Sequence, residues 1–293
     1  MSLTLEAAPS APLEAHRAPI HIGTVALLVH DLAAMTAFYR DAIGLDLIAG
    51  SEVGANLGVD GVVLVRLEAG AKSPTSTAGL FHLALLLSSR AALADWLAHA
   101  ATIRLPLDGA SDHLVSEALY LSDPEGNGIE IYRDRPRSDW PRDGEAIRMA
   151  TERLDLQGLL ADASGGAWSG MPSGTRMGHI HLRVGDTAQA EAFYRDTLGF
   201  DLMVRYPGAS FLATGGYHHH IAGNVWGSRG APPRGDGEAG LAWFALVAPG
   251  DTDFTAMRDR MLAAGGHAQS DPGQEKGPAI ADPWGNRMVL VRA

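Results

Sequence analysis

The 293-residue sequence contains no cysteine, which excludes disulfides, zinc–thiolate sites and thiol nucleophiles together. Histidine, aspartate and glutamate therefore remain as the strong metal ligands. Clusters of positive charge are also missing, because 23 Lys and Arg residues stand against 34 Asp and Glu, for a formal net charge of −11. Such a charge repels a phosphate backbone, so we expect no nucleic-acid partner. No apolar run approaches a membrane span, and residues 1–19 lack a continuous apolar segment, so we expect a cytoplasmic protein without membrane contact.

An internal repeat dominates what is present. Thr24–Ile48 aligns without a gap on His179–Met203, with 12 of 25 positions identical. Both copies read as an alternating strand and then a helix that carries Ala-Phe-Tyr-Arg-Asp and ends at a glycine. The repeat therefore predicts two equivalent modules, one in each half of the chain, and each consists of a strand, a helix and further strands.

A second pair of segments repeats between these copies and after the last one. Each segment opens a strand at Gly-Leu (residues 79–80 and 240–241), continues through a helix (Ala91–Ala100 and Phe254–Ala264), and reaches Asp-Pro-x-Gly-Asn before a final strand. Pro at the second and Gly at the fourth position favour a type I turn between antiparallel strands. The chain is thus predicted to contain four βαβββ modules, an α+β fold.

The repeats also divide the chain. We assign residues 1–20 to an N-terminal tail, 21–78 to module one, 79–133 to module two, 134–177 to a linker, 178–238 to module three and 239–293 to module four. The linker is rich in Pro and Arg and then in Gly and Ser, with a predicted short helix at Leu156–Ala161. A connection of this length either wraps the surface or covers a site, and the sequence leaves both open.

These motifs together resemble the vicinal oxygen chelate superfamily, which includes glyoxalases, drug-sequestering resistance proteins and extradiol dioxygenases. Tyr217–Ile221 (Tyr-His-His-His-Ile), Asp112–Tyr120 and the Gly-Asn-Gly-Ile-Glu-Ile-Tyr stretch are similar to the two-domain bacterial catechol 2,3-dioxygenases. The resemblance covers nearly the whole chain apart from the tail and linker. It implies paired modules that form incomplete barrels around a divalent metal.

Equivalent positions of the modules locate the predicted metal ligands. The first-strand position is Thr24, His82, His179 and Trp243 in modules one to four, and the last-strand position is Glu130 in module two but Val289 in module four. His82, His179 and Glu130 make the two-histidine, one-carboxylate set that leaves three positions open on Fe(II), with Mn(II) as the alternative.

These ligands can meet only if the modules pair in a particular way. Pairing one with two and three with four would separate His179 from His82 and Glu130. We therefore predict that modules two and three form one incomplete barrel, which holds the metal, and that modules one and four form a second, metal-free barrel. Its lack of ligands leaves assembly of a homo-oligomer as a hypothesis for its role.

Three consecutive histidines stand where module one, aligned by sequence, has Val63, Leu64 and Val65. We interpret them as a strand, so that His219 faces opposite to His218 and His220. The resemblance favours His219 as the acid/base residue, with His218 or His220 as the alternative.

The resemblance also implies other site residues. Tyr120, ten residues before Glu130, and His113 are expected beside the substrate oxygens. Asn224, Trp226 and His220 are expected to line the substrate pocket.

The predicted function is an Fe(II)-dependent extradiol dioxygenase that cleaves a catechol-type aromatic diol with O2. One rival is a glyoxalase-like isomerase or lyase, which would require a second carboxylate where this chain has His179. Another is a metal-free binding protein that sequesters small molecules. Which diol is cleaved cannot be deduced from these residues.

Overall fold

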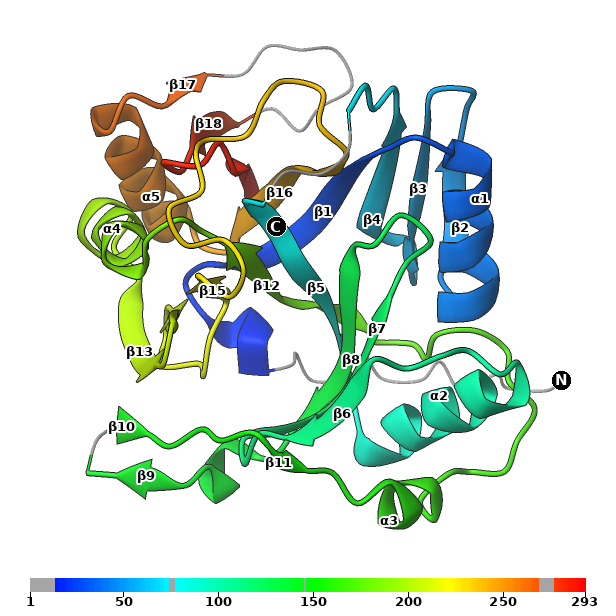
Figure 1. Ribbon diagram of the computed structural model, residues 1–293. Coiled ribbons are helices and arrows are strands. Elements are labelled where there is room, and N and C mark those ends of the chain that lie inside the picture. The colour runs from blue at the N-terminus through cyan, green and yellow to red at the C-terminus, as the bar shows by residue number, and fades with distance from the viewer. Residues whose placement is uncertain (1–13, 74–76, 145, 269–276) are drawn as a thin grey trace, which may run out of the picture.

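The computed structural model describes residues 14–73, 77–144, 146–268 and 277–293, so most of the expected N-terminal tail lies outside the described residues. Two curled sheets and peripheral helices make up the molecule (Figure 1). The first sheet has the order β17-β18-β19-β16-β1-β4-β3-β2. Its strands are β1 (His21–Val29), β2 (Asp46–Gly50), β3 (Gly54–Val59), β4 (Val62–Ala69), β16 (Gly240–Ala248), β17 (His267–Ala268), β18 (Pro278–Ala281) and β19 (Arg287–Arg292).

The second sheet has the order β11-β6-β7-β8-β5-β12-β15-β14-β13. Its strands are β5 (Gly79–Leu87), β6 (Gly109–Asp112), β7 (Ser116–Ser122), β8 (Gly128–Asp134), β11 (Glu152–Arg153), β12 (Arg176–Arg183), β13 (Asp201–Tyr206), β14 (Ala209–Ala213) and β15 (Ile221–Asn224). In every module the first strand runs parallel to the last, as in β1 with β4 and β5 with β8. The first sheet thus contains modules one and four, and the second contains modules two and three.

The predicted non-sequential pairing of modules is confirmed. The first strands of the paired modules lie side by side and antiparallel, β1 with β16 and β5 with β12. The registers correspond: Ala26 pairs with Trp243 in one sheet, and the equivalent His181 pairs with His82 in the other. All four first strands are buried for most of their length, and their apolar side chains contribute to a core that extends through both sheets.

Each odd-numbered module carries a short helix that widens into a π-helix. In module one α1 (Leu32–Ala37) is capped by the Asp31 side chain and continues into η2 (Phe38–Ile43). In module three α4 (Thr187–Glu191), capped by Asp186, continues into η4 (Ala192–Thr197). The even-numbered modules carry longer α-helices, α2 (Arg90–Thr102) and α5 (Asp251–Ala263).

The two repeated motifs meet in space and connect the barrels. The hydroxyl of Tyr39, in the Phe-Tyr-Arg-Asp motif of module one, donates to Asp123 Oδ2 in the turn of module two at 3.1 Å. Tyr194 of module three donates in the same way to Asp282 of module four at 3.0 Å. Since both pairs are buried and join modules that belong to different sheets, these hydrogen bonds tie one barrel to the other.

The segment between modules two and three follows the surface. It forms the 3-10 helix η3 (Arg137–Asp139), the small hairpin β9 (Arg142–Asp143) with β10 (Ala146–Ile147), and β11, which pairs with β6. The short helix appears as α3 (Leu156–Leu160) and packs on α2. Farther along, the Trp168 ring stacks on His99 with centroids 4.5 Å apart. The 3-10 helix η1 (Glu14–Arg17) precedes β1. Within the described residues, no helix has both the length and the apolar character needed to cross a membrane.

Candidate active site

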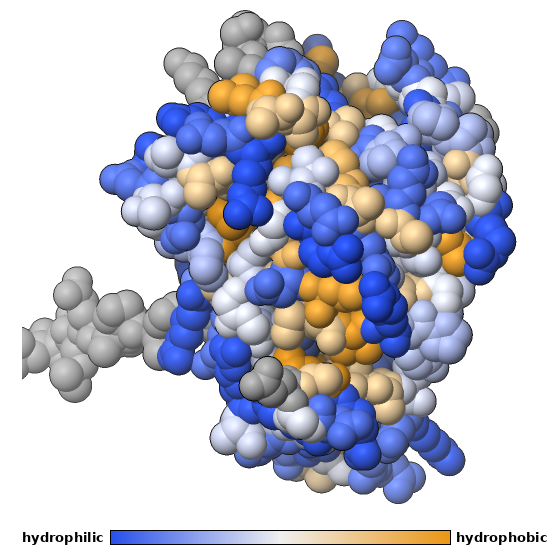
Figure 2. Space-filling model, turned by 90° about the vertical axis from the view of Figure 1, so that its left-hand side faces the viewer, coloured by the Kyte–Doolittle hydropathy of each residue, from blue (hydrophilic) through white to orange (hydrophobic). Residues whose placement is uncertain are grey.

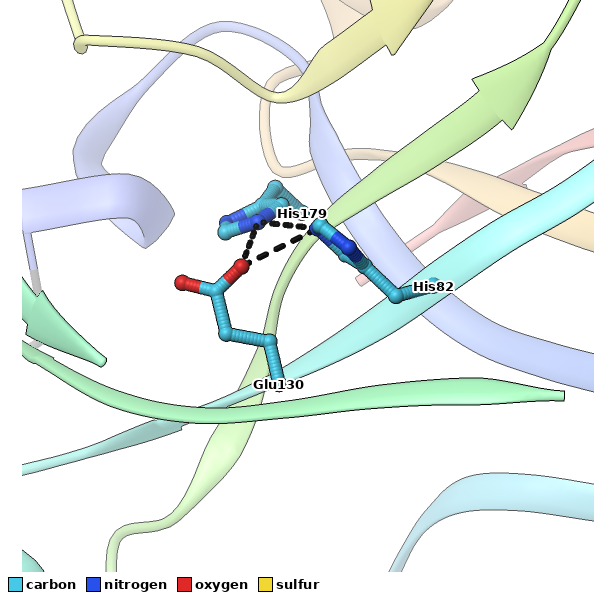
Figure 3. Close-up of side chains that lie close together, drawn as sticks. All are labelled: His82, Glu130 and His179. Atoms are coloured by element: carbon cyan, nitrogen blue, oxygen red, sulfur yellow. Dashed lines mark hydrogen bonds and ion pairs between the residues drawn. The ribbon is translucent and has the colours of Figure 1, made fainter. Parts of the chain in front are cut away.

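Three adjacent strands of the second sheet direct one side chain each to a common point. His82 comes from β5, Glu130 from β8 and His179 from β12, and Figure 3 shows their polar ends converging. Glu130 Oε2 lies 3.0 Å from His82 Nε2 and 3.1 Å from His179 Nε2, and the two nitrogens are 3.3 Å apart. All three residues are buried.

This triangle fits a metal ion. Bonds of ~2.1 Å at right angles place two ligand atoms ~3.0 Å apart, close to the three separations seen here. Among the described residues, this is the set of His, Asp and Glu side chains that lie close enough together to share one ion. In the other sheet the equivalent positions hold Thr24, Trp243 and Val289, none of which is a comparable ligand.

The protonation states also suit a metal. Burial lowers the pKa of His179 to about 4, an effect that the neighbouring Glu130 only partly opposes. For Glu130, burial alone would raise the pKa, but its close contacts with the His179 and His82 rings hold it well below its usual range. A neutral imidazole and an ionised carboxylate are the forms in which these side chains bind a cation.

A pocket of about 330 Å³ lies against this cluster. His82 and Glu130 form part of its wall, and the rest is mainly apolar. The apolar lining includes Phe81, Val204, Tyr206, Phe211, Trp226 and Met149. The face of the molecule drawn in Figure 2 carries apolar surface in its middle, bordered by hydrophilic residues. A mainly apolar cavity that also carries polar groups is typical of small-molecule sites.

His113 and Tyr120 form a hydrogen-bonded pair in the pocket wall. His113 Nδ1 lies 2.7 Å from the carbonyl oxygen of Ala150, which can only accept, so Nδ1 carries the proton. Nε2 of a neutral His113 is then an acceptor, and the Tyr120 hydroxyl donates to it at 2.6 Å. Tyr120 also pairs with Glu130 in the β7–β8 register, and burial and Glu130 raise the pKa of its phenol well above 10.

The three histidines do not form the strand expected from the sequence. Gly215 and Gly216 both have positive φ and turn the chain after β14, so His218–His220 lie in an irregular segment before β15. The strand register also shifts the repeat by one residue. In module one Val25 pairs with Val65, and in module three the equivalent Ile180 pairs with Ile221. Ile221 therefore corresponds to Val65, and His219 corresponds to Val63 and not to Leu64 as in the sequence alignment.

Because the segment is irregular, alternation does not decide which way the histidines point. The ring of His219 lines the pocket and packs on His179 with centroids 4.1 Å apart. His218 lies behind it rather than on the opposite side, with the two Nδ1 atoms 2.8 Å apart. Burial, with the neighbouring His179 and His218, lowers the pKa of His219 well below 6.5.

His220 points away from the pocket, contrary to its expected contact with substrate. Its Nδ1 accepts from the backbone N–H of Thr214 at 3.3 Å, so its Nε2 donates to the carbonyl oxygen of Ala15 at 2.9 Å. Both ring nitrogens are therefore satisfied in a fully buried, neutral side chain. This arrangement identifies His220 as a packing residue.

Trp226 lines the pocket, whereas Asn224 is not among the lining residues and contacts one of them, His181. Asn224 Oδ1 accepts from the backbone N–H of Trp226, and its Nδ2 donates to His181 Nε2 at 3.0 Å. His181, which sequence reasoning missed, is buried and lines the pocket. Its position two residues after His179 on the same strand, where module one has Ala26, was the available signal.

The linker supplies part of the pocket wall. Met149, Ala150 and Thr151 line it on the side of His113, and β11 follows directly after them. The segment thus both wraps the surface and covers one side of the pocket.

Comparisons with known proteins agree with this description. A family model described as Glyoxalase/Bleomycin resistance protein/Dioxygenase superfamily matches residues 21–131 and 176–290. A Bacillus subtilis (strain 168) protein described as catechol-2,3-dioxygenase is 42% identical over 257 residues, covering 84% of this chain and 88% of the relative.

Solved structures share the fold at low sequence identity. A structure from Bacillus subtilis subsp. subtilis str. 168 has a TM-score of 0.63 at 12% identity and covers 93% of this chain and 84% of that chain. Glyoxalase I from Zea mays has a TM-score of 0.56 at 16% identity, covering 94% of each chain.

Proposed function

The chain belongs to the glyoxalase/bleomycin resistance/dioxygenase superfamily, and from this premise we propose that it is an Fe(II)-dependent extradiol dioxygenase acting on a catechol-type diol. The observation that carries the proposal is the position of the His82–Glu130–His179 triangle beside a mainly apolar pocket, whose wall includes His82, Glu130 and His219. Two histidines and one carboxylate are the ligand set of oxygen-activating iron sites that leave adjacent positions open. The similarity to a protein described as catechol-2,3-dioxygenase supports the same reaction class.

The metal would be held by His82, Glu130 and His179. Fe(II) bound there would supply the acidification of a diol hydroxyl and the one-electron chemistry that dioxygen requires.

The protein's own groups would handle the protons and the orientation of the ring. His219, packed on His179, would accept the proton of the second hydroxyl and return it later. The Tyr120 phenol, with its pKa well above 10, would stay protonated and donate to His113 Nε2, so that its oxygen would accept a hydrogen bond from a substrate hydroxyl. Phe81 and Trp226 would pack against the ring.

The pocket supports a substrate larger than a bare ring. An apolar cavity of ~150 Å³ holds a benzene molecule, whereas this pocket is about 330 Å³. Val204, Tyr206 and Phe211 supply further apolar surface, so an apolar substituent on the diol would fit better than a charged one.

The test combines metal analysis with oxygen consumption. Protein purified anaerobically and loaded with Fe(II) is expected to hold about one iron per chain and to consume O2 with catechol. An alkyl- or aryl-substituted catechol is expected to give a lower KM, and both products should be yellow. His219→Gln should retain iron and lose most of kcat, by ~100-fold or more.

A matched control is His220→Gln, a buried histidine of the same segment that lies outside the pocket. It should retain both iron and turnover. Iron binding without O2 uptake for any diol would exclude the dioxygenase. Turnover of a glutathione hemithioacetal instead would establish the glyoxalase alternative.

A further inference from the structure

A chain of hydrogen bonds runs from the pocket, through His218, to a partly buried carboxylate outside it. His219 lines the pocket, His218 lies behind it, and Asp134 at the end of β8 lies behind His218. The His219 and His218 Nδ1 atoms are 2.8 Å apart, and His218 Nε2 is 2.8 Å from Asp134 Oδ1. His218 is fully buried.

The other oxygen of the same carboxylate accepts from Tyr217, which in turn contacts Tyr132. The Tyr217 hydroxyl donates to Asp134 Oδ2 at 2.9 Å. The Tyr132 hydroxyl, 2.9 Å from that of Tyr217, must then donate to it, because the Tyr217 proton is already committed. Both carboxylate oxygens therefore act as acceptors, and Asp134 is fixed in orientation.

These contacts determine where the ring protons lie. A carboxylate oxygen only accepts, so His218 Nε2 must carry a proton and donate it to Asp134. A neutral His218 then has a lone pair on Nδ1, and a short contact with His219 Nδ1 requires that His219 donate. Neutral His219 thus has its proton on Nδ1 and a free lone pair on Nε2.

We propose that Asp134, acting through His218, is a positioning residue that fixes His219 in the Nδ1-protonated tautomer and directs a basic Nε2 at the substrate. The inference rests on the proposed function only for the role given to His219; the tautomer itself follows from the hydrogen bonds. A carboxylate that orients a catalytic histidine in this way acts by the same physics in serine proteases. Here a second imidazole is interposed.

The alternative tautomer would be unproductive. With its proton on Nε2, His219 would present a donor to the pocket and could not accept a hydroxyl proton. Module one has Val62 and Val63 at the register positions of His218 and His219, so the metal-free barrel has no such chain.

The direct test is nuclear magnetic resonance of the imidazole nitrogens in Zn(II)-loaded, ¹⁵N-histidine-labelled protein, because zinc is diamagnetic. Signals of His219 are assigned by their loss in His219→Gln. Wild type is expected to show His219 with a protonated Nδ1 and a bare Nε2. In Asp134→Asn the amide has one acceptor oxygen for two donors, His218 Nε2–H and the Tyr217 hydroxyl. His218 is then no longer held with its proton on Nε2, so the Nε2-protonated form of His219 should become populated.

Two further variants separate the chain from general structure. Tyr217→Phe removes the other partner of the same carboxylate and should leave the His219 tautomer unchanged. His218→Phe interrupts the chain without altering Asp134 and should abolish the tautomer preference, which keeps the test decisive even when Asp134→Asn folds poorly. With Fe(II) and catechol, Asp134→Asn should lower kcat by ~100-fold or more while KM changes far less.

The outcomes distinguish this inference from the proposed function. A wild-type spectrum with His219 protonated on Nε2, or an unchanged spectrum in both Asp134→Asn and His218→Phe, would overturn it. The predicted spectra together with no O2 uptake from any diol would leave the hydrogen-bond chain established and the dioxygenase wrong.

Discussion

His82 and His181 pair directly across the junction of modules two and three, with ring centroids 4.9 Å apart. One is a predicted metal ligand and the other is a pocket residue held by Asn224. Since Asn224 donates to His181 Nε2, a neutral His181 carries its proton on Nδ1, which has no hydrogen-bond partner among the described residues. The ring therefore keeps an N–H available for a ligand.

Replacing His181 should affect substrate binding more than metal binding. His181→Phe keeps the ring volume and removes the donor, so we expect one iron per chain and a KM for catechol raised by roughly 5- to 30-fold, the effect of losing one buried hydrogen bond. Asn224→Ala should shift KM in the same direction by less. Steady-state kinetics with parallel iron analysis measure both, and loss of iron in His181→Phe would show that this residue supports the metal instead.

Removing a predicted ligand should weaken metal binding, whereas a change at the equivalent position of the other barrel should not. We expect His179→Ala to lower metal affinity by at least ~100-fold, because even residues that merely orient a ligand account for ~10- to 100-fold. Thr24→Ala changes the equivalent position of the other barrel, where the hydroxyl donates to the carbonyl oxygen of Val63, and should leave affinity unchanged. Competition with a metal-sensitive dye gives both affinities. Equal losses in the two variants would contradict a single site in modules two and three.

Stability should fall in mild acid because several histidines are buried in neutral form. Burial lowers the pKa of His16 to about 3, of His21 to about 4 and of His220 to about 3. Between pH 6.5 and these values the unfolded chain binds protons that the folded chain does not. Each such histidine therefore contributes stability that is complete above pH 6.5 and is lost as the pH falls, by up to ~1.4 kcal/mol per pH unit.

Urea unfolding of metal-free protein at pH 7, 6 and 5 measures this slope. His220→Gln should be less stable than wild type at pH 7 but should show a shallower decline with acid. His30→Gln, at an exposed histidine, should reproduce the wild-type slope. A wild-type free energy of unfolding that does not change over this range would refute the assignment of these histidines as neutral.

The Tyr39–Asp123 and Tyr194–Asp282 hydrogen bonds should contribute to folding stability and not to metal binding. Tyr39→Phe leaves the buried Asp123 with one hydrogen bond fewer, and we expect a loss of about 1–3 kcal/mol in the free energy of unfolding with unchanged iron content. Tyr194→Phe should cost a similar amount, because it removes the equivalent bond to Asp282. The exposed Tyr206 offers a comparison, since its replacement by Phe should change stability by less than ~0.5 kcal/mol. Loss of iron in Tyr39→Phe would mean that the connection between barrels also shapes the metal site.

Much of this protein was determined by its sequence alone. Four modules could be predicted from the alternation of apolar residues in the strands, the glycines that end the helices and the repeated turn. These signals depend on local backbone preferences, so they are visible in the sequence. Comparison of the aligned copies then identified His82, Glu130 and His179 as predicted metal ligands. The equivalent residues Thr24, Trp243 and Val289 are not comparable ligands. The module pairing followed because three ligands must converge on one ion.

Tertiary structure decided what local patterns cannot encode. Gly215 and Gly216 both adopt positive φ, and the strand predicted for the three histidines does not form. As a result His218 contacts His219, and His220 hydrogen-bonds the carbonyl oxygen of Ala15. The link from His219 to Asp134 spans more than 80 residues of sequence, as does the bond from Tyr39 to Asp123. Such contacts depend on how sheets curl and pack, which is a property of the whole core and not of any one segment.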